Sequence, residues 1–442
     1  MRYCTMLPWL LACTLVAAPA TASGYRDGPC GDFTVAMIPD TQNYVDYRHQ
    51  KWSGFRFDAV EQYYQQMRWI AANARSAGGD IVFATHVGDV WQHYSAWMDA
   101  DHAARGFKWI PNGGSEVARS PKTHTKGFEI PAAVQGFELI AGKLPFSVVP
   151  GNHDFDALWT DPAHPPQPHL KKDGKRHVGG LKGFQSAFSD TSPFFAEQPW
   201  YVGAHEGGAD SAQVFTAGKC RFLHIGLQYH APDASLAWAS KTIERYPGLP
   251  VIVSMHDYLD RDGTRNRRSN PDNSALDPRD NNPEMIWDEF VSRHDRIFLV
   301  LSGHVGGQGL SVATNRAGHP VYQMMADYQG RGQTAKAAGV EKTDIGDGWL
   351  RLLRFRLDDN RPRIEVRTYS THYGKFASEI PEYADWYKAH DGQAALSDAD
   401  YLKRDEFTIE LGGFYRRFTS TPPKPRNEQL APRRRQAISV GG

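Results

Sequence analysis

The sequence lacks a net charge, because its 50 lysine and arginine residues are matched by 50 aspartate and glutamate residues. Such a chain has no long-range positive field to attract a polyanion, which argues against a protein that coats nucleic acid. No fixed period recurs, and this excludes collagen, coiled coils and repeat arrays. Apolar residues make up 40% of the 442 residues and aromatic residues 12%, enough for a sizeable core in one large or two ordinary domains.

The apolar stretch at the N-terminus is too short to cross a membrane. Arg2 supplies a positive start, residues 7–18 are mostly apolar, and Ala20-Thr21-Ala22 is a small-residue cleavage site. Residues 1–22 therefore indicate a signal peptide and predict an exported chain, periplasmic or secreted; a buried N-terminal helix is the alternative. Residues 10–13 resemble a lipidation box, but apolar residues follow it, so a lipoprotein is less favoured.

Cysteine is scarce, with four residues in the whole chain. Cys4 and Cys13 would leave with the signal peptide, so that Cys30 and Cys220 remain. Two cysteines in an exported chain predict one disulfide between them, the alternative being two separate thiols.

The C-terminal end differs in composition from the rest of the chain. Residues 416–442 hold seven lysine and arginine residues, four prolines and a single acid, Glu428. We expect residues 419–442 to form a basic, disordered tail. Contact of this tail with an anionic lipid or polymer is the less favoured alternative to a merely solvated segment.

Short apolar runs alternate with segments of helical periodicity through the body of the chain. This alternation predicts an α/β layered fold. Long polar stretches interrupt it at about residues 99–131, 156–202 and 260–282, and we interpret them as insertions around a site. Strands are expected at residues 35–38, 81–84, 146–149, 222–227, 251–255, 297–301 and 321–325, helices at 58–74, at 235–245 and from 282, and a hairpin at 349–369.

Polar residues stand where the central strands are expected to end. In open α/β sheets, ligands bind beyond the carboxyl ends of the strands, so these residues are expected at one rim. Oxygen and imidazole groups that converge in this way suit a divalent metal ion. Each motif alone is also a common turn or a structural histidine, so the prediction depends on their combination. The motifs are Asp40-Thr41-Gln42, Gly88-Asp89, Gly151-Asn152-His153-Asp154, His256 and Gly303-His304-Val305-Gly306.

In this order the motifs resemble those of the calcineurin-like metallophosphoesterase family. The family pattern is Asp-x-His, Gly-Asp, Gly-Asn-His-Asp/Glu, His and Gly-His-x-His, and the resemblance extends over about residues 33–369. It implies a four-layer α/β/β/α sandwich of two mixed sheets, with a two-metal site at the C-terminal ends of the strands. Residues 23–418 would then form one catalytic domain that carries the three insertions.

The resemblance also implies a role for each motif residue. Asp89 would bridge both metal ions, and Asp40 would belong to the first site. His153 would act on the leaving group with Asp154 orienting it from behind, and Asn152 would also reach a phosphate oxygen. The metal ligands implied are Asp40, Gln42 and Asp89 for the first site and Asp89, Asn152, His256 and His304 for the second.

The chain departs from the family pattern at two positions that serve the first metal ion. Gln42 replaces the histidine of the first motif, and Gly306 replaces the second histidine of the last. The first site thereby keeps only oxygen donors, so we expect it to bind a hard ion and to bind it more weakly. Gln308 is a candidate substitute if the chain is extended there. His86 is a candidate residue behind the ligands or facing the substrate; an ordinary polar role in a loop is the alternative for both.

Together these features predict an exported phosphatase or phosphodiesterase that uses a metal-bound hydroxide to attack a small phosphorylated substrate. Two divalent ions are expected, and the sequence leaves open Mn, Fe, Zn, Mg and Ca, as well as the substrate and the oligomeric state. One alternative is a metal-depleted homologue that binds a phosphorylated or anionic ligand without hydrolysing it. Another is a carbohydrate-active or adhesive protein with an aromatic sugar-stacking surface, although no paired carboxylate motif suggests glycoside chemistry.

Overall fold

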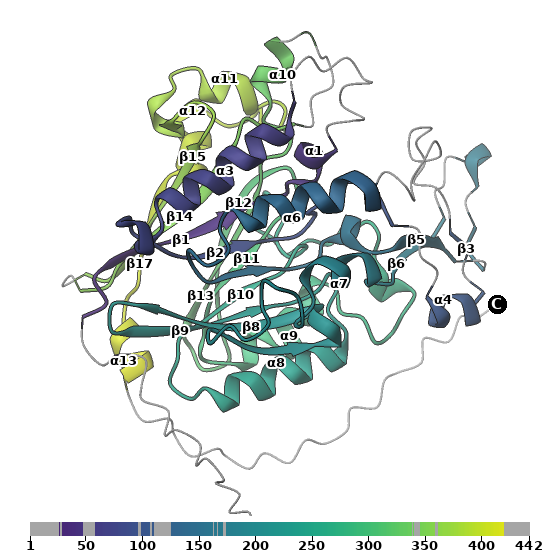
Figure 1. The fold of residues 1–442 in the computed structure, drawn as a ribbon, viewed down its shortest axis with the longest axis horizontal. Helices are drawn as coiled ribbons and strands as arrows, with labels where there is room; N and C mark the ends of the chain where they lie inside the picture. The colour runs from purple at the N-terminus through teal and green to yellow at the C-terminus, as the bar shows by residue number, and fades with distance from the viewer. Residues whose placement is uncertain are drawn as a thin grey trace, which may run out of the picture.

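The computed structural model describes residues 26, 29–46, 58–95, 99–106, 108–109, 125–161, 163–165, 167–170, 174–337, 339, 345–358 and 361–419. The expected signal peptide, and the expected tail beyond residue 419, lie outside the described residues. Within the described ranges the chain is a mixed α/β structure with two large mixed sheets, which confirms the predicted class (Figure 1). None of its described helices combines the length and apolarity that a membrane crossing requires.

The first large sheet joins both ends of the described chain. Its strand order is β16-β15-β14-β1-β2-β4, with β17 paired to β15. β1, β2 and β4 run parallel to one another, whereas β14 and β15 form the predicted antiparallel hairpin beside β1. The strands are β1 (Asp32–Ile38), β2 (Ile81–His86), β4 (Phe146–Val148), β14 (Trp349–Arg356), β15 (Arg363–Ser370), β16 (Lys375–Phe376) and β17 (Phe407–Glu410).

The second large sheet is built from the middle of the chain. Its order is β12-β13-β11-β10-β9-β8-β7, and its central strands β9, β10, β11 and β13 are parallel. These strands are short apolar runs that are buried over most of their length, as expected for parallel strands covered on both faces. They are β7 (Tyr201–His205), β8 (Asp210–Ala217), β9 (Cys220–Gly226), β10 (Val251–Ser254), β11 (Ile297–Ser302), β12 (Gly307–Thr314) and β13 (Pro320–Asp327).

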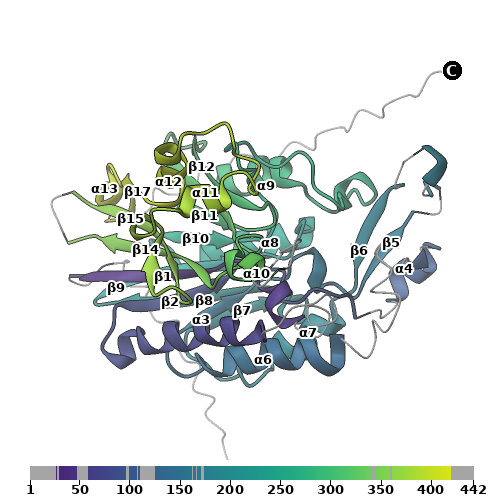
Figure 2. The same ribbon diagram turned by 90° about the horizontal axis from the view of Figure 1, so that it is seen from above.

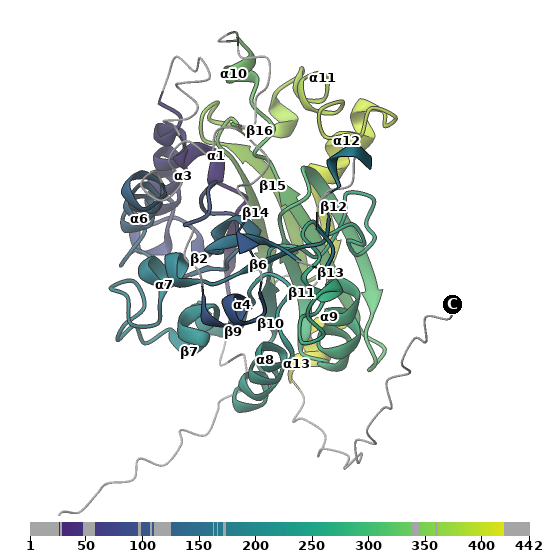
Figure 3. The same ribbon diagram turned by 90° about the vertical axis from the view of Figure 1, so that its right-hand side faces the viewer.

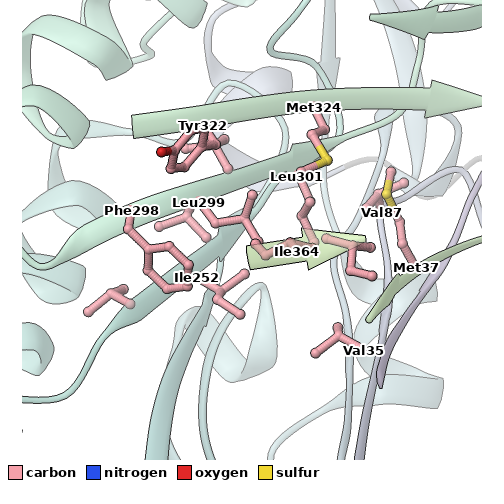
Figure 4. Packing of buried hydrophobic residues seen from close by; sticks show 14 of the residues in the cluster. Val35, Met37, Val87, Ile252, Phe298, Leu299, Leu301, Tyr322, Met324 and Ile364 are labelled. Carbon is pink, nitrogen blue, oxygen red and sulfur yellow. The ribbon is translucent and has the colours of Figure 1, made fainter. Parts of the chain in front are cut away.

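The two large sheets share one hydrophobic core. Residues of β1 alternate between faces, so that Val35 and Met37 enter the same buried cluster as Ile252 and Leu301 of the second sheet. Figure 4 shows these side chains of both sheets converging. Direct ring contacts across the core join β1 to β9 and β2 to β8, with ring centroids 5.3 Å apart for Phe33–Phe222 and 4.6 Å apart for Phe83–Phe215.

Helices pack on the sheet faces that point away from this shared core. α3 (Val60–Ala72) and α6 (Ile130–Glu138) pack together through Tyr63, whose hydroxyl donates to the Ala133 carbonyl at 3.0 Å, and they cover the other face of β1 and β2. α8 (Asp233–Arg245) and α9 (Pro283–Glu289) contribute to the cluster that contains β10 and β11. Figure 3 shows α3 and α6 on one side of the strands and α9 on the other.

The remaining described helices are shorter. α10, α11 and α12 lie near the ends of β14 and β15, together at the top of the molecule in the view of Figure 1. Their bounds, with those of the other short helices, are α1 (Gln42–Val45), α4 (Ala100–Ala104), α7 (Lys182–Phe188), α10 (Gln333–Ala337), α11 (Tyr383–Tyr387), α12 (Asp398–Asp405) and α13 (Phe414–Thr419).

The described residues of the long polar stretches include strands and helices. β3 (Lys108–Trp109), β5 (Ala157–Thr160) and β6 (Arg176–Gly179) form a small separate sheet, which projects from the body together with α4 (Figure 2). The described part of residues 156–202, expected as an insertion, therefore contains β5, β6, α7 and the start of β7. Residues 260–282 are mostly loop with one short 3-10 turn, Asn273–Ala275.

A disulfide joins Cys30, just before β1, to Cys220, the first residue of β9. Their Cα atoms are 5.0 Å apart. The predicted pairing is confirmed, and it ties the start of β1 in one large sheet to the start of β9 in the other. The thiol alternative is therefore wrong.

Candidate metal centre

Asp89 lies at the centre of the predicted site, in the loop after β2. It is 3% exposed and adopts a left-handed backbone with φ of 53°, next to Gly88 with φ of 101°. A Cβ added to Gly88 would lie 2.7 Å from His256 Nδ1, so only glycine allows this approach. The Asp89 carboxylate accepts hydrogen bonds from Gln42 Nε2 at 3.1 Å and from the His153 backbone N–H at 2.9 Å.

His256 follows β10 and joins the two carboxylates of the site. Its Nδ1–H donates to the Val87 carbonyl at 2.9 Å, which turns Nε2 toward Asp89 Oδ2 at 3.2 Å and Asp40 Oδ2 at 3.9 Å. Burial alone would lower the pKa of His256, but Asp89 and Asp40 raise it to about 10. Burial alone would raise the pKa of Asp89, but the nearby His256 and His153 hold the pKa of that carboxyl well below its usual value.

Asp40 and His304 close the other side of the group. The His304 backbone N–H lies 3.3 Å from both Asp40 carboxylate oxygens, and His304 Nδ1 lies 3.2 Å from His256 Nε2. Burial and His256 lower the pKa of His304 to about 4, with Asp257 acting in the opposite direction, so its ring is neutral at physiological pH. A neutral imidazole is the form that ligates metal ions.

Two amide oxygens at this place have no hydrogen-bond partner. Gln42 Oε1 and Asn152 Oδ1 are buried, since Gln42 is 2% exposed and Asn152 is 4% exposed. Neither oxygen accepts a hydrogen bond within the described part of the chain. Asn152 lies between Gly151, whose added Cβ would be 2.2 Å from Asp89 Oδ1, and His153. A buried oxygen without a donor is costly, and a cation removes that cost.

The donor set therefore fits a divalent cation. Ligand atoms of Asp89, His256 and His304 all lie within 4.8 Å of one another. The carboxylate of Asp40 and the partnerless oxygens of Gln42 and Asn152 add hard donors around them. The structure thus brings together Asp40, Gln42, Asp89, His256 and His304 through direct contacts. Asn152 lies next to Asp89 because its neighbours Gly151 and His153 both approach the Asp89 carboxylate.

His153 and Asp154 are placed differently from the expectation. His153 Nδ1 donates to the Gln92 carbonyl at 2.6 Å, while Nε2 lies 4.0 Å from Asp89 Oδ2. Asp154 accepts the backbone N–H groups of Gly151, Val90 and Trp91, at 2.8 to 3.2 Å, and no contact joins it to the His153 ring. Asp154 therefore fixes the loops after β2 and β4, and Gln92 rather than Asp154 orients His153.

Of the two accessory candidates, His86 lies behind the ligands and Gln308 belongs to another network. His86 is fully buried: its Nδ1 accepts the Gly88 N–H at 3.1 Å and its Nε2 donates to Thr41 Oγ1 at 2.8 Å, so it supports the loop from behind and does not face a substrate. Burial lowers the pKa of His86 to about 3. Gln308 Oε1 accepts from Arg331, and its Nε2 donates to the Tyr401 carbonyl at 3.3 Å. Its amide is committed to another network, so its proposed role as a substitute ligand is wrong.

Asp327, the last residue of β13, was missed from the sequence. It is 1% exposed and has the largest charge effect on Asp40 of any neighbouring group. Burial raises the pKa of Asp327 to about 6. Burial and the nearby Asp327 carboxylate together raise the pKa of Asp40 well above its usual value. The signal was available, because Asp327 follows a buried strand as Asp40 and Asp89 do.

Two further clusters of acids and histidines are less suited to a cation. Asp277 belongs to a group with His177 and Asp280, but Arg105 and Arg279 already pair with its carboxylate at 2.9 and 2.7 Å. In the group of Asp46, His93 and Glu129, the Glu129 carboxylate contacts His93 Nδ1 at 2.6 Å and accepts two backbone N–H groups. Arginine and backbone donors thus satisfy much of the acceptor capacity that a cation would use.

A cavity opens beside His304. It has a volume of about 540 Å³, and its lining includes Gly306, Arg261 and Arg268. Apart from its chain neighbours, no described atom lies within 4 Å of a Cβ added to Gly306, so this position, where the resembled motif has its second histidine, faces open space. A larger cavity of about 970 Å³ contains none of the candidate ligands, since it lies at the N-terminal end of β11, around Arg293 and Arg296.

The arginines of residues 260–282 have different surroundings. Arg265 pairs with Glu284 at 2.5 Å and lies over the Trp287 ring, and Arg279 pairs with Asp277. Arg268 lines the cavity beside His304. Of the basic residues in this segment, Arg261 and Arg268 are those that line this cavity, which Asp260 and Asp262 also line.

Comparison with known proteins does not identify the chain. No protein-family model matches it, and no curated protein matches it.

Proposed function

We propose that the chain is a metal-dependent phosphoester hydrolase of the calcineurin-like metallophosphoesterase family, exported to the periplasm or beyond. The observation that carries the proposal is the meeting of Asp40, Gln42, Asp89, His256 and His304 after four different strands or their loops, with two partnerless amide oxygens beside them. This combination supports a cation site at the C-terminal ends of parallel strands. The shared core and the outer helices support a four-layer α/β/β/α sandwich.

The proposed ligands divide into two groups around Asp89. Asp40, Gln42 and Asp89 would hold the first ion, and Asp89, Asn152, His256 and His304 the second. Bound divalent ions would supply electrophilic polarisation of a phosphoryl oxygen and a more acidic water molecule. The oxygen-only first group would bind its ion more weakly than the group with two imidazoles.

His153 is the residue proposed to meet the leaving group. Its Nδ1–H is held by the Gln92 carbonyl, so the ring orientation is fixed and Nε2 is the atom that can deliver a proton. Tyr94 stacks on the ring, with centroids 5.8 Å apart and planes 6° apart, and restricts it further. His153 would donate a proton from Nε2 to the leaving oxygen, and Asn152 would contact a phosphoryl oxygen.

The main rival is a metal-depleted homologue that binds an anionic ligand without hydrolysis, and Gln42 and Gly306 favour it. The sugar-stacking alternative has little support, because among the described residues no aromatic side chain is one of the exposed large apolar groups. Those groups are Leu170, Met285, Leu310 and Val312.

A substrate panel combined with elemental analysis tests the proposal. The full chain is stripped with a chelator, reloaded with Mn²⁺, and assayed with phosphomonoesters, phosphodiesters and nucleotides. Asp89→Asn should lose bound metal and at least about 10²–10³-fold in kcat/KM. Asp80→Asn, at the opposite end of β2, is the matched control and should keep both. Metal binding without turnover of any ester would favour the non-catalytic rival, and turnover by Asp89→Asn with unchanged metal content would contradict the proposal.

A further inference from the structure

Asp327 ends a strand that lies next to the strand carrying His304. β13 runs parallel to β11, with Met325 opposite Ser302, and antiparallel to β12, with Asp327 opposite Gly307. The C-terminal ends of β11 and β13 therefore reach the same edge of the second sheet. Asp327 is placed there by the same rule that places His304 after β11.

Hydrogen bonds connect Asp327 to the side of the site that holds Gln42. Its two carboxylate oxygens accept the backbone N–H of Gln329 at 3.0 Å and Gln329 Nε2 at 3.3 Å. Gln329 Oε1 in turn accepts from Asn43 Nδ2 at 2.7 Å, and Asn43 directly follows Gln42 in α1. Asp327 thus belongs to the half of the site that has lost both family histidines.

Buried carboxylates in this half of the site favour a bound cation. Asp40, Asp89 and Asp327 are all at most 3% exposed, and each carboxylate influences the others electrostatically. Three buried carboxylates near one another are costly unless positive charge balances them. The partnerless Gln42 Oε1 is an independent sign of a cation, because Gln42 Nε2 donates to Asp89 and so fixes this amide at the site.

We propose that Asp327 is a ligand of the first metal ion and replaces, with a carboxylate, the imidazoles that Gln42 and Gly306 do not provide. The inference rests on the proposed metal-dependent function. The first site then consists of Asp40, Gln42, Asp89 and Asp327, all oxygen donors, and selects a hard ion such as Mg²⁺ or Mn²⁺. Each Asp327 oxygen keeps a lone pair beyond its bond to Gln329.

The test counts Mn²⁺ ions bound to the full chain. The chelated protein is titrated with Mn²⁺, and the free ion is followed by its electron paramagnetic resonance signal. The wild type should bind two ions, one tightly and one weakly. Asp327→Asn should keep the tight ion and weaken the other at least about tenfold. Asp210→Asn is the matched control, since Asp210 is equally buried and accepts the backbone and side-chain amides of one glutamine, Gln228, without contacting the candidate ligands.

A thermal melt separates a ligand role from a structural role. In the metal-free protein, Asp327→Asn removes one charge from the buried carboxylates while Asn keeps an acceptor for the Gln329 N–H, so its Tm should equal or exceed the wild-type Tm. If the Asp327 carboxylate were purely structural, metal-free Asp327→Asn would have a lower Tm than the metal-free wild type. Added Mn²⁺ at saturating concentration should raise the Tm of this variant less than that of the wild type.

Each outcome of the titration decides the inference. Two ions bound to Asp327→Asn with wild-type affinities would overturn it and leave the proposed function intact. If the wild type binds a single ion, the inference about Asp327 is wrong and the proposed function stands. If the wild type binds no ion, both the inference and the proposed function are wrong. If Asp327→Asn does not fold, Asp327→Glu moves the carboxylate by one methylene and should weaken the same ion selectively; unchanged binding there contradicts the inference.

Discussion

The protonation of His256 depends strongly on its neighbours in the site. Its pKa is raised to about 10 by Asp89 and Asp40, against the effect of burial. A group with a raised folded-state pKa contributes stability that is fully present below its unfolded value, about 6.5, and is lost as the pH rises through about 10. The metal-free protein should therefore lose stability between these two pH values.

The same pKa predicts how metal binding depends on pH. A ligating imidazole must be neutral, so binding displaces the His256 proton at every pH below about 10 and becomes tighter as the pH rises. At pH 8, calorimetry of Mn²⁺ binding in two buffers of different ionisation enthalpy should show release of at least about one proton. His256→Gln should remove that release together with the tight binding. Affinity that does not change between pH 7 and 9 would contradict the assignment of His256 as a ligand.

Neighbouring residues of one motif are predicted to have separable roles. His153→Gln keeps the backbone N–H bond to Asp89 but loses the ring bond to the Gln92 carbonyl, so it should lower kcat by about 10²–10⁴-fold with only a small change in Tm. Asp154→Asn places an amide against the N–H groups of Gly151, Val90 and Trp91, so it should destabilise the fold by about 1–3 kcal/mol. Steady-state kinetics and urea unfolding of both variants provide the comparison. An Asp154→Asn variant of full stability with reduced kcat would restore the orienting role expected from the sequence.

At the level of elements, the strand ends were predictable and the turns between them were not. The predicted apolar runs became β1, β2, β4, β9, β10, β11 and β13, each within a few residues of its expected bounds. Gln308 was misjudged because side-chain alternation holds only in an extended chain. His304 has a φ of 72° and β12 begins at Gly307, so a turn separates His304 from Gln308.

Other site contacts depend on long-range neighbours that no local pattern contains. Asp154 was expected to face His153, but a 3-10 turn directs it to backbone groups of another loop. Asp327 was overlooked although it obeys the strand-end rule, because no family motif marks its position. The sequence therefore predicts which strands deliver ligands, and only the packed loops determine which polar groups meet.

Gln308 gives a prediction for the network between β12 and the C-terminal helices. Arg331 is fully buried and is held by Asp391, Asp405 and Tyr383 as well as by Gln308. Gln308→Ala leaves a guanidinium N–H without its acceptor and should cost about 1–3 kcal/mol in unfolding free energy. Chemical denaturation measures that loss, and elemental analysis should show unchanged metal content. A variant of normal stability that lacks one metal ion would return Gln308 to the site.

At the level of the whole molecule, the disulfide closes a loop that includes most of the candidate site. Cys30 and Cys220 are 190 residues apart and connect the two large sheets. A crosslink over a loop of this length is expected to stabilise the fold by about 3–5 kcal/mol, mainly by restricting the unfolded chain. This arrangement suits an oxidising compartment and is compatible with export.

Removing the disulfide provides the corresponding prediction. The double variant Cys30→Ser/Cys220→Ser should unfold at a lower denaturant concentration than the wild type, with a free energy of unfolding smaller by about 3–5 kcal/mol. Once folded, it should bind metal as the wild type does, because neither cysteine contacts a candidate ligand within the described residues. Reduction of the wild type by dithiothreitol serves as the control. A stability unchanged by both treatments would mean that the crosslink contributes nothing to folding.

The central claim is that side chains from five separate loops hold metal ions at one place. Diffraction from crystals soaked in Mn²⁺, recorded at the manganese absorption edge, tests it directly. We predict an anomalous peak within about 2.0–2.4 Å of ligand atoms of Asp89, Asn152, His256 and His304, and a weaker second peak on the Asp40 side. Anomalous peaks confined to other sites, such as the group of Asp46, His93 and Glu129, would contradict the account.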